Sequence, residues 1–209
     1  MKFNLMGVLT YYNVSKANIA RFRGTKQEIQ ADKLEYETDP EKQKLYFRYV
    51  MLRTKGVETL INIISKLREI DCFYDLTMGS GKVVEVVHAA FPRLHIVGYE
   101  QNPTRYKLLK AKYPQSTIRR KFTNEYMDFG RSIVTIDPPW GGWDILKGDR
   151  SLIGFIKGLT IGQLLNCLKA PYFILNLPRN YYLKDITNHV KKIEVYETGK
   201  SAMMILATK

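Results

Sequence analysis

The segment Asp75–Lys82, with the sequence DLTMGSGK, joins a short apolar run to a stretch with helical spacing. Gly79 and Gly81 allow the chain to turn tightly and let a ligand approach the backbone closely, because glycine has no side chain. In open α/β sheets, ligands bind at such a turn between a strand and the following helix. Valine follows Lys82. The segment therefore lacks the Gly-Lys-Ser/Thr sequence of a phosphate-binding loop, which disfavours a nucleotide triphosphatase.

Strand and helix patterns alternate from residue 72 onward. We expect strands at Cys72–Leu76, His95–Glu100, Ser116–Arg119, Ser132–Asp137, Tyr172–Leu177, Lys192–Tyr196 and Ser201–Ala207, and helices at Lys82–Ala90, Pro103–Tyr113, Thr160–Lys169 and Leu183–Val190. This alternation implies a mostly parallel, seven-stranded sheet covered on both faces. A short glycine-containing turn, Glu197–Lys200, joins the last two strands and predicts an antiparallel C-terminal hairpin.

The chain ahead of this α/β pattern has a different character. Residues 1–43 are polar and show no clean period, and residues 1–27 contain no acidic side chain, so we expect an irregular basic arm. Residues 44–70 carry apolar positions at roughly helical spacing, interrupted near Gly56, which predicts a helical extension. The main domain is then expected at 71–209.

The net charge indicates a polyanionic partner. Among 209 residues, 33 are Lys or Arg and 20 are Asp or Glu, a formal net charge of +13. Neutralising nucleic-acid phosphates releases condensed counterions and supplies most of the sequence-independent affinity. Between positions 105 and 121 the chain has basic residues and no acidic one: Arg105, Lys107, Lys110, Lys112, Arg119, Arg120 and Lys121. The first four also fit an ordinary solvated helix face.

Other classes of protein are disfavoured by what the sequence does not contain. No apolar run approaches the ~18 residues of a membrane span, and the first residues do not look like a secretion signal. We therefore expect an intracellular protein of the nucleus or cytoplasm, including that of a host cell if a virus encodes it. Cys72 and Cys167 cannot build a disulfide framework or a four-cysteine zinc site. The histidines lack metal-ligand spacing, so we predict no metal; they are His88, His95 and His189.

An acidic residue at the end of the second predicted strand points to a nucleoside-containing cofactor. Glu100 stands nineteen positions after Gly81. A carboxylate at that distance accepts hydrogen bonds from both ribose hydroxyls in dinucleotide and S-adenosylmethionine sites. Asp75 either caps and orients the glycine loop or reaches a methionine amino group, which a dinucleotide lacks. We predict S-adenosylmethionine as cofactor, with Thr77, within the loop, as a further contact. After the third strand, where such folds usually hold the adenine, any residue of 124–128 could contact the cofactor, and we take Asp128 as the candidate.

The run Asp137–Gly142, with the sequence DPPWGG, follows the apolar stretch Ser132–Ile136. An exocyclic amine on a purine is a poor nucleophile until hydrogen-bond acceptors converge on its N–H groups. The Asp137 carboxylate and the Pro138 carbonyl can supply two, because proline cannot continue a sheet ladder. Trp140 can stack on the base, a contact worth roughly 1–3 kcal/mol. The alternative is a strand that ends in a Pro-Pro turn with a core tryptophan.

Two motifs on either side of a predicted helix resemble those of one enzyme family. The motifs are PPWGG at Pro138–Gly142 and LPRN at Leu177–Asn180. On these residues the chain is similar to the RNA cap guanine-N2 methyltransferases, the group of trimethylguanosine synthase, over residues 43–209. The resemblance implies a class I S-adenosylmethionine-dependent methyltransferase with a Rossmann-like fold. It also implies transfer of a methyl group to the N2 amino group of a 7-methylguanosine cap on RNA, giving di- or trimethylguanosine.

The resemblance further implies roles for single residues. Trp140 would stack on N7-methylguanine, which is cationic and attracted to an indole face. Arg179 and Asn180 would bind the cap, with Arg179 at its phosphates. Trp143 stands where the family usually has proline and is a second stacking residue or a lid residue. Asp137, where the family often has serine, would contact cofactor and base and completes the candidate catalytic set with Pro138 and Trp140.

Two other functions stay open. Asp-Pro-Pro-Trp is also a motif of adenine-N6 methyltransferases acting on DNA or RNA, and Asp137 suits an adenine amine. An enzyme that flips adenine out of a duplex usually needs an added recognition segment, for which this chain has little room. The third function is a catalytically silent RNA-binding subunit, which the acidic and glycine residues of the cofactor half disfavour.

Overall fold

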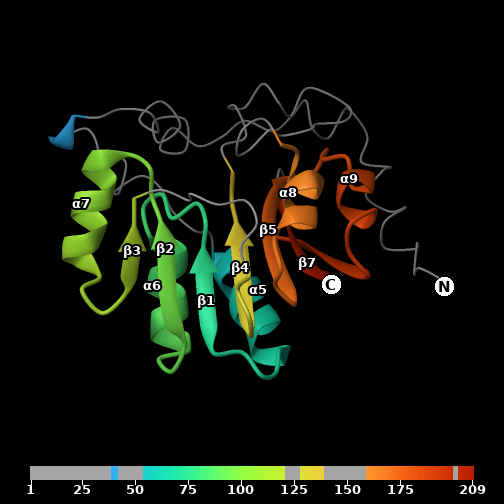
Figure 1. The fold of residues 1–209 in the computed structure, drawn as a ribbon, viewed down its shortest axis with the longest axis horizontal. Helices are drawn as coiled ribbons and strands as arrows, with labels where there is room; N and C mark the ends of the chain where they lie inside the picture. The colour runs from blue at the N-terminus through green and yellow to red at the C-terminus, as the bar shows by residue number, and fades with distance from the viewer. Residues whose placement is uncertain (1–38, 42–53, 121–127, 139–158, 200–201) are drawn as a thin grey trace. The chain divides into compact units, whose positions relative to one another are not determined.

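The structure is a computed structural model that describes residues 39–41, 54–120, 128–138, 159–199 and 202–209. These residues belong to two compact units, one within Arg23–Thr123 and the other within Asn124–Lys209, called here the first and the second unit. Each is described by itself (Figure 1). The segment from Pro139 to Trp143, which holds both tryptophans, lies outside the described residues.

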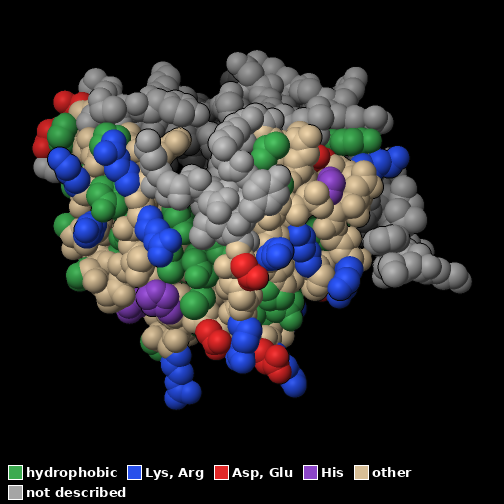
Figure 2. Space-filling view, in the orientation of Figure 1, with side chains coloured by type: hydrophobic (Ala, Val, Ile, Leu, Met, Phe, Trp, Pro, Cys, Tyr) green, Lys and Arg blue, Asp and Glu red, His purple; other side chains and the backbone are tan. Residues whose placement is uncertain are grey.

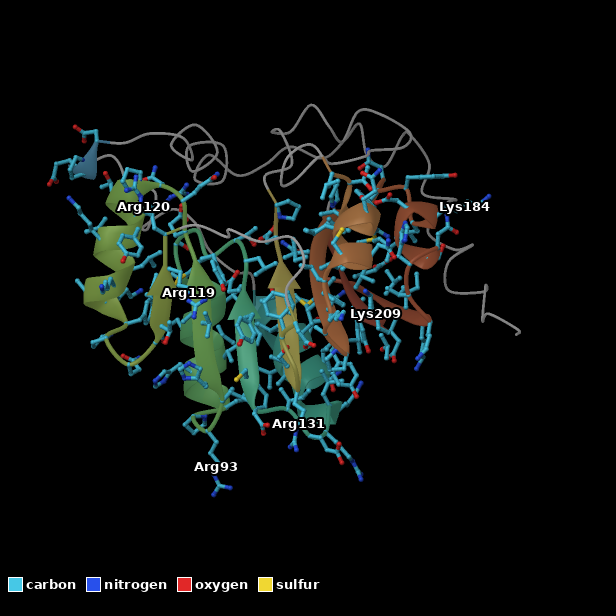
Figure 3. The ribbon with its side chains drawn as sticks, in the orientation of Figure 1. Arg93, Arg119, Arg120, Arg131, Lys184 and Lys209 are labelled. Atoms are coloured by element: carbon cyan, nitrogen blue, oxygen red, sulfur yellow. The ribbon has the colours of Figure 1, made fainter. Side chains whose placement is uncertain are left out.

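The first unit is a parallel α/β layer. Its elements are α5 (Thr54–Lys66), β1 (Cys72–Asp75), α6 (Lys82–Ala90), β2 (His95–Tyr99), α7 (Pro103–Lys112) and β3 (Thr117–Arg119). The strands are parallel in the order β3-β2-β1. Both crossovers step in the same direction and are right-handed by rule, which places α6 and α7 on one face of the strands. Arg93 precedes β2 and Arg120 follows β3, so the two labels in Figure 3 mark opposite ends of these strands.

Apolar spacing explains the helices of this unit. On α5, Leu60, Ile63 and Ile64 are at most 5% exposed, which places one helical stripe in the core. Burying each such side chain contributes roughly 1.5–3 kcal/mol. The start of α7 is fixed by Asn102, whose side-chain oxygen accepts hydrogen bonds from the backbone N–H groups of Thr104 (3.0 Å) and Arg105 (3.1 Å).

The second unit holds the other strands. Its elements are β4 (Ser132–Ile136), α8 (Ile161–Cys167), β5 (Tyr172–Pro178), α9 (Lys184–Thr187), β6 (Lys192–Glu197) and β7 (Ala202–Thr208). β4 and β5 are parallel, whereas β7 is antiparallel to both β5 and β6. Every residue of β4 is buried, as expected for an inner strand of a parallel sheet.

The strand order is β3-β2-β1-β4-β5-β7-β6, a seven-stranded and mostly parallel sheet with an antiparallel hairpin at its end. The prediction of the Rossmann-like fold of class I S-adenosylmethionine-dependent methyltransferases is confirmed. Lys and Arg side chains are prominent on the face in Figure 2.

Two helices are shorter than the sequence suggests. Thr160 is the N-cap of α8 and Leu168 is already extended, so that helix ends at Cys167. α9 stops at Thr187, before Val190. The β-branched Ile186 and Thr187 lower its helix propensity, and Asn188 favours a turn. α5 lies within the 44–70 segment, of which residues 44–53 lie outside the described residues.

Candidate active site

The turn after β1 is built as a glycine loop capped by a buried carboxylate. Asp75 is 2% exposed, and its Oδ1 accepts a hydrogen bond of 3.0 Å from the Thr77 N–H. Gly79 (φ 53°) and Gly81 (φ 76°) have positive φ, which side-chain-bearing residues rarely adopt. The Gly81 N–H donates to the Met78 carbonyl at 2.7 Å and closes the turn. Of the two roles foreseen for Asp75, this contact supports the loop cap, and the amino-group contact stays a prediction.

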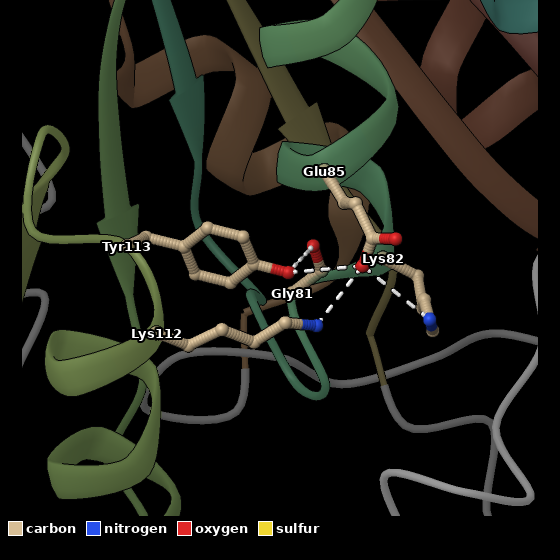
Figure 4. A network of polar contacts seen from close by, with 5 residues as sticks. All are labelled: Gly81, Lys82, Glu85, Lys112 and Tyr113. Carbon is tan, nitrogen blue, oxygen red and sulfur yellow. Dashed lines mark hydrogen bonds and ion pairs between the residues drawn. The ribbon is translucent and has the colours of Figure 1, made fainter.

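A tyrosine beyond the end of α7 holds the same loop from outside (Figure 4). The Tyr113 hydroxyl lies 3.1 Å from the Gly81 carbonyl and 3.2 Å from Glu85 Oε2, and it can donate to either oxygen. Lys112 and Lys82 also reach this carboxylate oxygen, at 2.9 and 3.3 Å, and the hydrogen bond from Lys112 is the main cause that lowers the Glu85 pKa. Burial raises the Tyr113 pKa, so its hydroxyl stays a donor. No sequence pattern links Tyr113 to a glycine 32 positions away.

Glu100, the predicted ribose acceptor, is buried at the end of β2 together with a cation. It is 5% exposed, and its Oε1 accepts a hydrogen bond of 2.7 Å from the Asn102 N–H. The backbone of Gly79 also hydrogen-bonds to this carboxylate, which connects the glycine loop to β2. Arg105 Nε lies 3.5 Å from Glu100 Oε2. The sequence had grouped Arg105 with solvated lysines, but it is 6% exposed, because it supplies the counter-charge of Glu100.

The Glu100 carboxyl provides a pH test of the cofactor half. Burial raises its pKa above the usual 4.5, and Arg105 and the neighbouring N–H groups oppose this only in part. A raised carboxyl pKa stabilises the fold below the usual value, and this contribution is lost as pH rises through the raised pKa. The affinity for S-adenosylmethionine should change with pH in the opposite direction to the stability of the fold. Ribose hydroxyls donate best to an ionised carboxylate, which forms as pH rises.

We therefore expect affinity for S-adenosylmethionine to rise with pH across the range just above 4.5. Calorimetric titration from about pH 4 to about pH 7 measures this affinity. Urea unfolding over the same range measures the free energy of unfolding, which should fall as pH rises. In Glu100→Gln this titration is removed, so both pH dependences should flatten. An unchanged pH profile in Glu100→Gln would assign the effect to another group.

Asp137 and Asp128 lie near opposite ends of β4. Asp137 follows Ile136 at the carboxyl end, where its side chain is exposed, and the next residue, Pro138, is buried. Asp128 lies before the amino end, where its Oδ1 accepts a hydrogen bond of 2.9 Å from the Gly130 N–H and its backbone bridges Lys169. The sequence placed both aspartates at the cofactor. Ligands of such sheets bind at the carboxyl ends of the strands, where Asp137 lies, and the cofactor contact of Asp128 stays a prediction.

The predicted cap-binding pair lies at the exit of β5. Arg179 follows Pro178, the last residue of β5, and its Nη2 pairs with the Glu197 carboxylate of β6. Asn180, the next residue, is 8% exposed. The Glu197 side chain is 48% exposed, whereas the Arg179 side chain is only 18% exposed, so this ion pair is partly buried. A phosphate that binds Arg179 would have to take the place of Glu197.

A carboxylate that sequence reasoning missed fixes this exit segment. Asp185, in α9, accepts hydrogen bonds from the Tyr181 hydroxyl (2.6 Å), the Thr160 hydroxyl (2.6 Å) and the Gly162 N–H (2.7 Å). Burial, followed by the Asp185 hydrogen bond, raises the Tyr181 pKa, which keeps the hydroxyl a donor. Tyr181 directly follows Asn180, so Asp185 ties the Arg179–Asn180 segment to the start of α8.

Replacing Asp185 with alanine is expected to lower the free energy of unfolding by about 2–4 kcal/mol, because three donors lose a charged acceptor. Tyr181→Phe removes one of these bonds and should cost about 1 kcal/mol. Urea unfolding of both variants measures the difference. Equal costs for the two variants would show that Asp185 does not hold α8, α9 and the β5 exit together.

Two features, a group of metal-binding side chains and a membrane-spanning helix, are absent from the part of the chain that the structure describes. Within it, no three His, Cys, Asp or Glu side chains gather in a way that could hold a metal ion. None of the helices found there is long and apolar enough to cross a membrane.

Comparison with known proteins identifies the fold. No protein-family model matches the chain, and no curated protein matches its sequence. Among solved structures, a putative O-methyltransferase from Nostoc punctiforme PCC 73102 matches 95% of this chain and 71% of its own, with TM-score 0.57 and 10% identity. Human N-acetylserotonin methyltransferase in complex with S-adenosylmethionine matches 94% and 72%, with TM-score 0.52 and 11% identity. The 23S rRNA methyltransferase ErmE matches 77% and 70%, with TM-score 0.52 and 14% identity.

Proposed function

We propose that this protein transfers a methyl group from S-adenosylmethionine to the N2 amino group of a 7-methylguanosine RNA cap, giving di- or trimethylguanosine. The observation that carries the proposal is Asp137, exposed at the carboxyl end of the buried strand β4 and followed in the sequence by Pro-Pro-Trp-Gly-Gly. The fold is shared with methyltransferases, one of them in complex with S-adenosylmethionine and another named for ribosomal RNA.

The loop after β1 fits the cofactor. Gly79 and Gly81, both with positive φ, let a ligand lie against the backbone, and Glu100 offers a carboxylate at the end of the next strand. When bound, S-adenosylmethionine supplies an electrophilic methyl group on a sulfonium. The protein orients it through Glu100, whose carboxylate Arg105 holds in place.

Asp137 acts on the accepting nitrogen. Its carboxylate accepts a hydrogen bond from the amine and stabilises the positive charge that develops on nitrogen as the new bond forms. The Pro138 carbonyl is the second acceptor, and Trp140 stacks on the cationic base. As the bond from nitrogen to the methyl carbon forms, the bond from that carbon to sulfur would break, and the proton that the cationic nitrogen then loses would pass to water. Positioning supplies several kcal/mol, so no dedicated general base is required.

A second candidate function is adenine-N6 methylation, which Asp137 favours because adenine-specific enzymes share Asp-Pro-Pro-Trp. The experiment offers labelled S-adenosylmethionine with four acceptors in parallel: a 7-methylguanosine cap analogue, an unmethylated cap analogue, adenine-containing RNA and adenine-containing DNA. We expect transfer to the 7-methylguanosine cap alone, at N2 by mass spectrometry. Transfer only to adenine would replace the cap reaction with the second candidate. Binding of RNA without transfer to any acceptor would indicate a silent subunit.

Trp140→Ala is expected to abolish transfer to the cap while leaving affinity for S-adenosylmethionine nearly intact, because stacking on the base contributes roughly 1–3 kcal/mol and also sets its position. Radiolabel transfer and calorimetric titration measure the two properties. Trp140→Phe keeps an aromatic face and should restore part of the activity. A fully active alanine variant would show that Trp140 has a structural role.

A further inference from the structure

The outer side of α7 and the end of β3 carry exposed cations that form no ion pair with a described carboxylate. The side chains of Lys107, Lys110, Arg119 and Arg120 are exposed. Among the described residues, none of the four forms an ion pair: Lys110 lies 5.9 Å from the Tyr106 ring centre, and Arg119 lies near the Tyr99 ring and hydroxyl. Residues 101–120 contain no Asp or Glu. Arg119 and Arg120 are labelled in Figure 3, and blue side chains gather over α7 in Figure 2.

The basic residues of this region divide into two groups by partner. Arg105 is buried against Glu100, and Lys112 pairs with Glu85 beside the glycine loop. Both of these cations therefore have a structural partner within the first unit. Among the residues that the structure describes, Lys107 and Arg120 form no ion pair and Lys110 contacts only the Tyr106 ring, so their charges stay available to a ligand.

This set of exposed cations, called here the α7–β3 face, begins at the ligand-binding end of the parallel strands. Arg120 follows β3 as Glu100 follows β2 and as the glycine loop follows β1. Carboxyl ends of neighbouring parallel strands meet at the same edge. α7 packs against β3, so Lys107 and Lys110 extend the face away from that edge.

We infer that the α7–β3 face binds the phosphates of single-stranded RNA; the inference rests on the proposed function and adds to it a surface that holds the RNA chain. Exposed, unpaired cations without intervening carboxylates match a phosphate backbone. Charged residues on an edge strand also discourage strand pairing, but Lys107 and Lys110 lie on a helix, where that explanation does not apply. A membrane partner fits less well, because Leu109 of α7 is fully buried and Leu108 is half-buried, so neither leucine is fully exposed for insertion.

The test compares two triple variants that remove equal charge. Lys107→Gln/Lys110→Gln/Arg120→Gln alters the face and leaves Arg119, which contacts Tyr99, in place. The control, Arg93→Gln/Lys169→Gln/Lys191→Gln, alters three exposed cations that each precede a strand. The probe is a fluorescein-labelled oligouridylate, with binding followed by anisotropy at several salt concentrations.

We expect the face variant to bind the oligouridylate on the order of 100-fold more weakly than the wild type at ~0.1 M salt. The negative slope of log K against log[salt] should become less steep by about 2, since each single-strand phosphate contact contributes about 0.7. For a capped oligonucleotide, KM should rise while kcat is kept. For the cap analogue without RNA, kcat/KM should stay unchanged. The control variant should match the wild type throughout.

The outcomes separate the inference from the proposed function. Equal oligouridylate binding by the face variant and the wild type would overturn the inference, as would an equal loss in the control variant. Tighter binding of the wild type to phosphatidylserine vesicles than to the oligouridylate, lost in the face variant, would also overturn it in favour of a membrane. A wild type that methylates no cap analogue would overturn the proposed function, while the anisotropy result still decides the role of the face.

Discussion

Replacing Asp137 with alanine is expected to lower kcat/KM for methyl transfer by about 10²–10³, the size of effect seen when one preorganised charge-stabilising group is removed from an active site. The variant should bind S-adenosylmethionine within about twofold of the wild type if Asp137 acts mainly on the base, since only an interaction made in the transition state is then lost. Asp137 is exposed at the end of β4, so its truncation leaves no cavity in the core. Transfer assays under single-turnover conditions and calorimetric titration measure the two quantities.

The reason lies in the charge that develops on the accepting nitrogen. The neutral amine becomes cationic as it forms a bond to the methyl carbon, and a carboxylate within hydrogen-bond distance stabilises that charge. Asp137→Asn is the matched control, because its amide oxygen keeps one acceptor without the charge. We expect it to retain more activity than the alanine variant and to lose about tenfold. If both variants transfer at the wild-type rate, the amine is held by another group.

Replacing Gly81 with alanine is expected to destabilise the protein by about 2–4 kcal/mol and to weaken S-adenosylmethionine binding at least about tenfold, through backbone strain and overpacking together. A Cβ on Gly81 would lie 2.7 Å from Tyr113 Cε2 and 2.8 Å from Leu109 Cδ2. Leu109 is fully buried, and Tyr113 can move only by giving up its hydrogen bond to the Gly81 carbonyl. Thermal unfolding and calorimetric titration measure both effects.

Gly130 offers the matched control for this substitution. It also has positive φ, 57°, but a Cβ there would meet no atom within 4 Å. Gly130→Ala should therefore cost only the backbone term, about 1–2 kcal/mol, and leave cofactor affinity unchanged. The difference between the two alanine variants isolates the contact with Tyr113 and Leu109. Equal losses would show that Tyr113 adjusts freely and does not hold the loop.

The elements of this fold could be predicted because their signals are local. Apolar runs marked the strands, Gly79 and Gly81 marked the turn after β1, and the Glu197–Lys200 turn marked the hairpin, so the sheet agreed with the sequence within a few residues. The position of Glu100 directly after β2 could be predicted for the same reason, since its spacing from Gly81 is fixed by one helix and one strand. The assignment of Asp128 relied on the segment after β3, of which residues 121–127 lie outside the described residues.

The partners of these residues could not be predicted, because side chains far apart in sequence form them. The sequence places Arg105 among the exposed lysines of a basic helix, but in the structure it is buried against Glu100. Tyr113 reaches Gly81 across 32 positions, and Asp185 reaches Thr160 across 25. No sequence motif marks Tyr113 or Asp185. Either side chain can hold a loop in place only because the fold brings distant residues within hydrogen-bond distance of it.

The placement of β7 has a consequence for synthesis on the ribosome. β7 follows both β5 and β6 in sequence, but it lies between them, pairing with β5 along Ala202–Thr208 and with β6 along Met203–Thr208. During synthesis, β5 and β6 therefore leave the ribosome before β7, the strand that pairs with both. Until β7 follows, each has one edge whose backbone N–H and C=O groups lack their sheet partners. Such edges invite aggregation. A nascent chain that stalls shortly before Ala202 should depend on chaperones far more than the finished protein does.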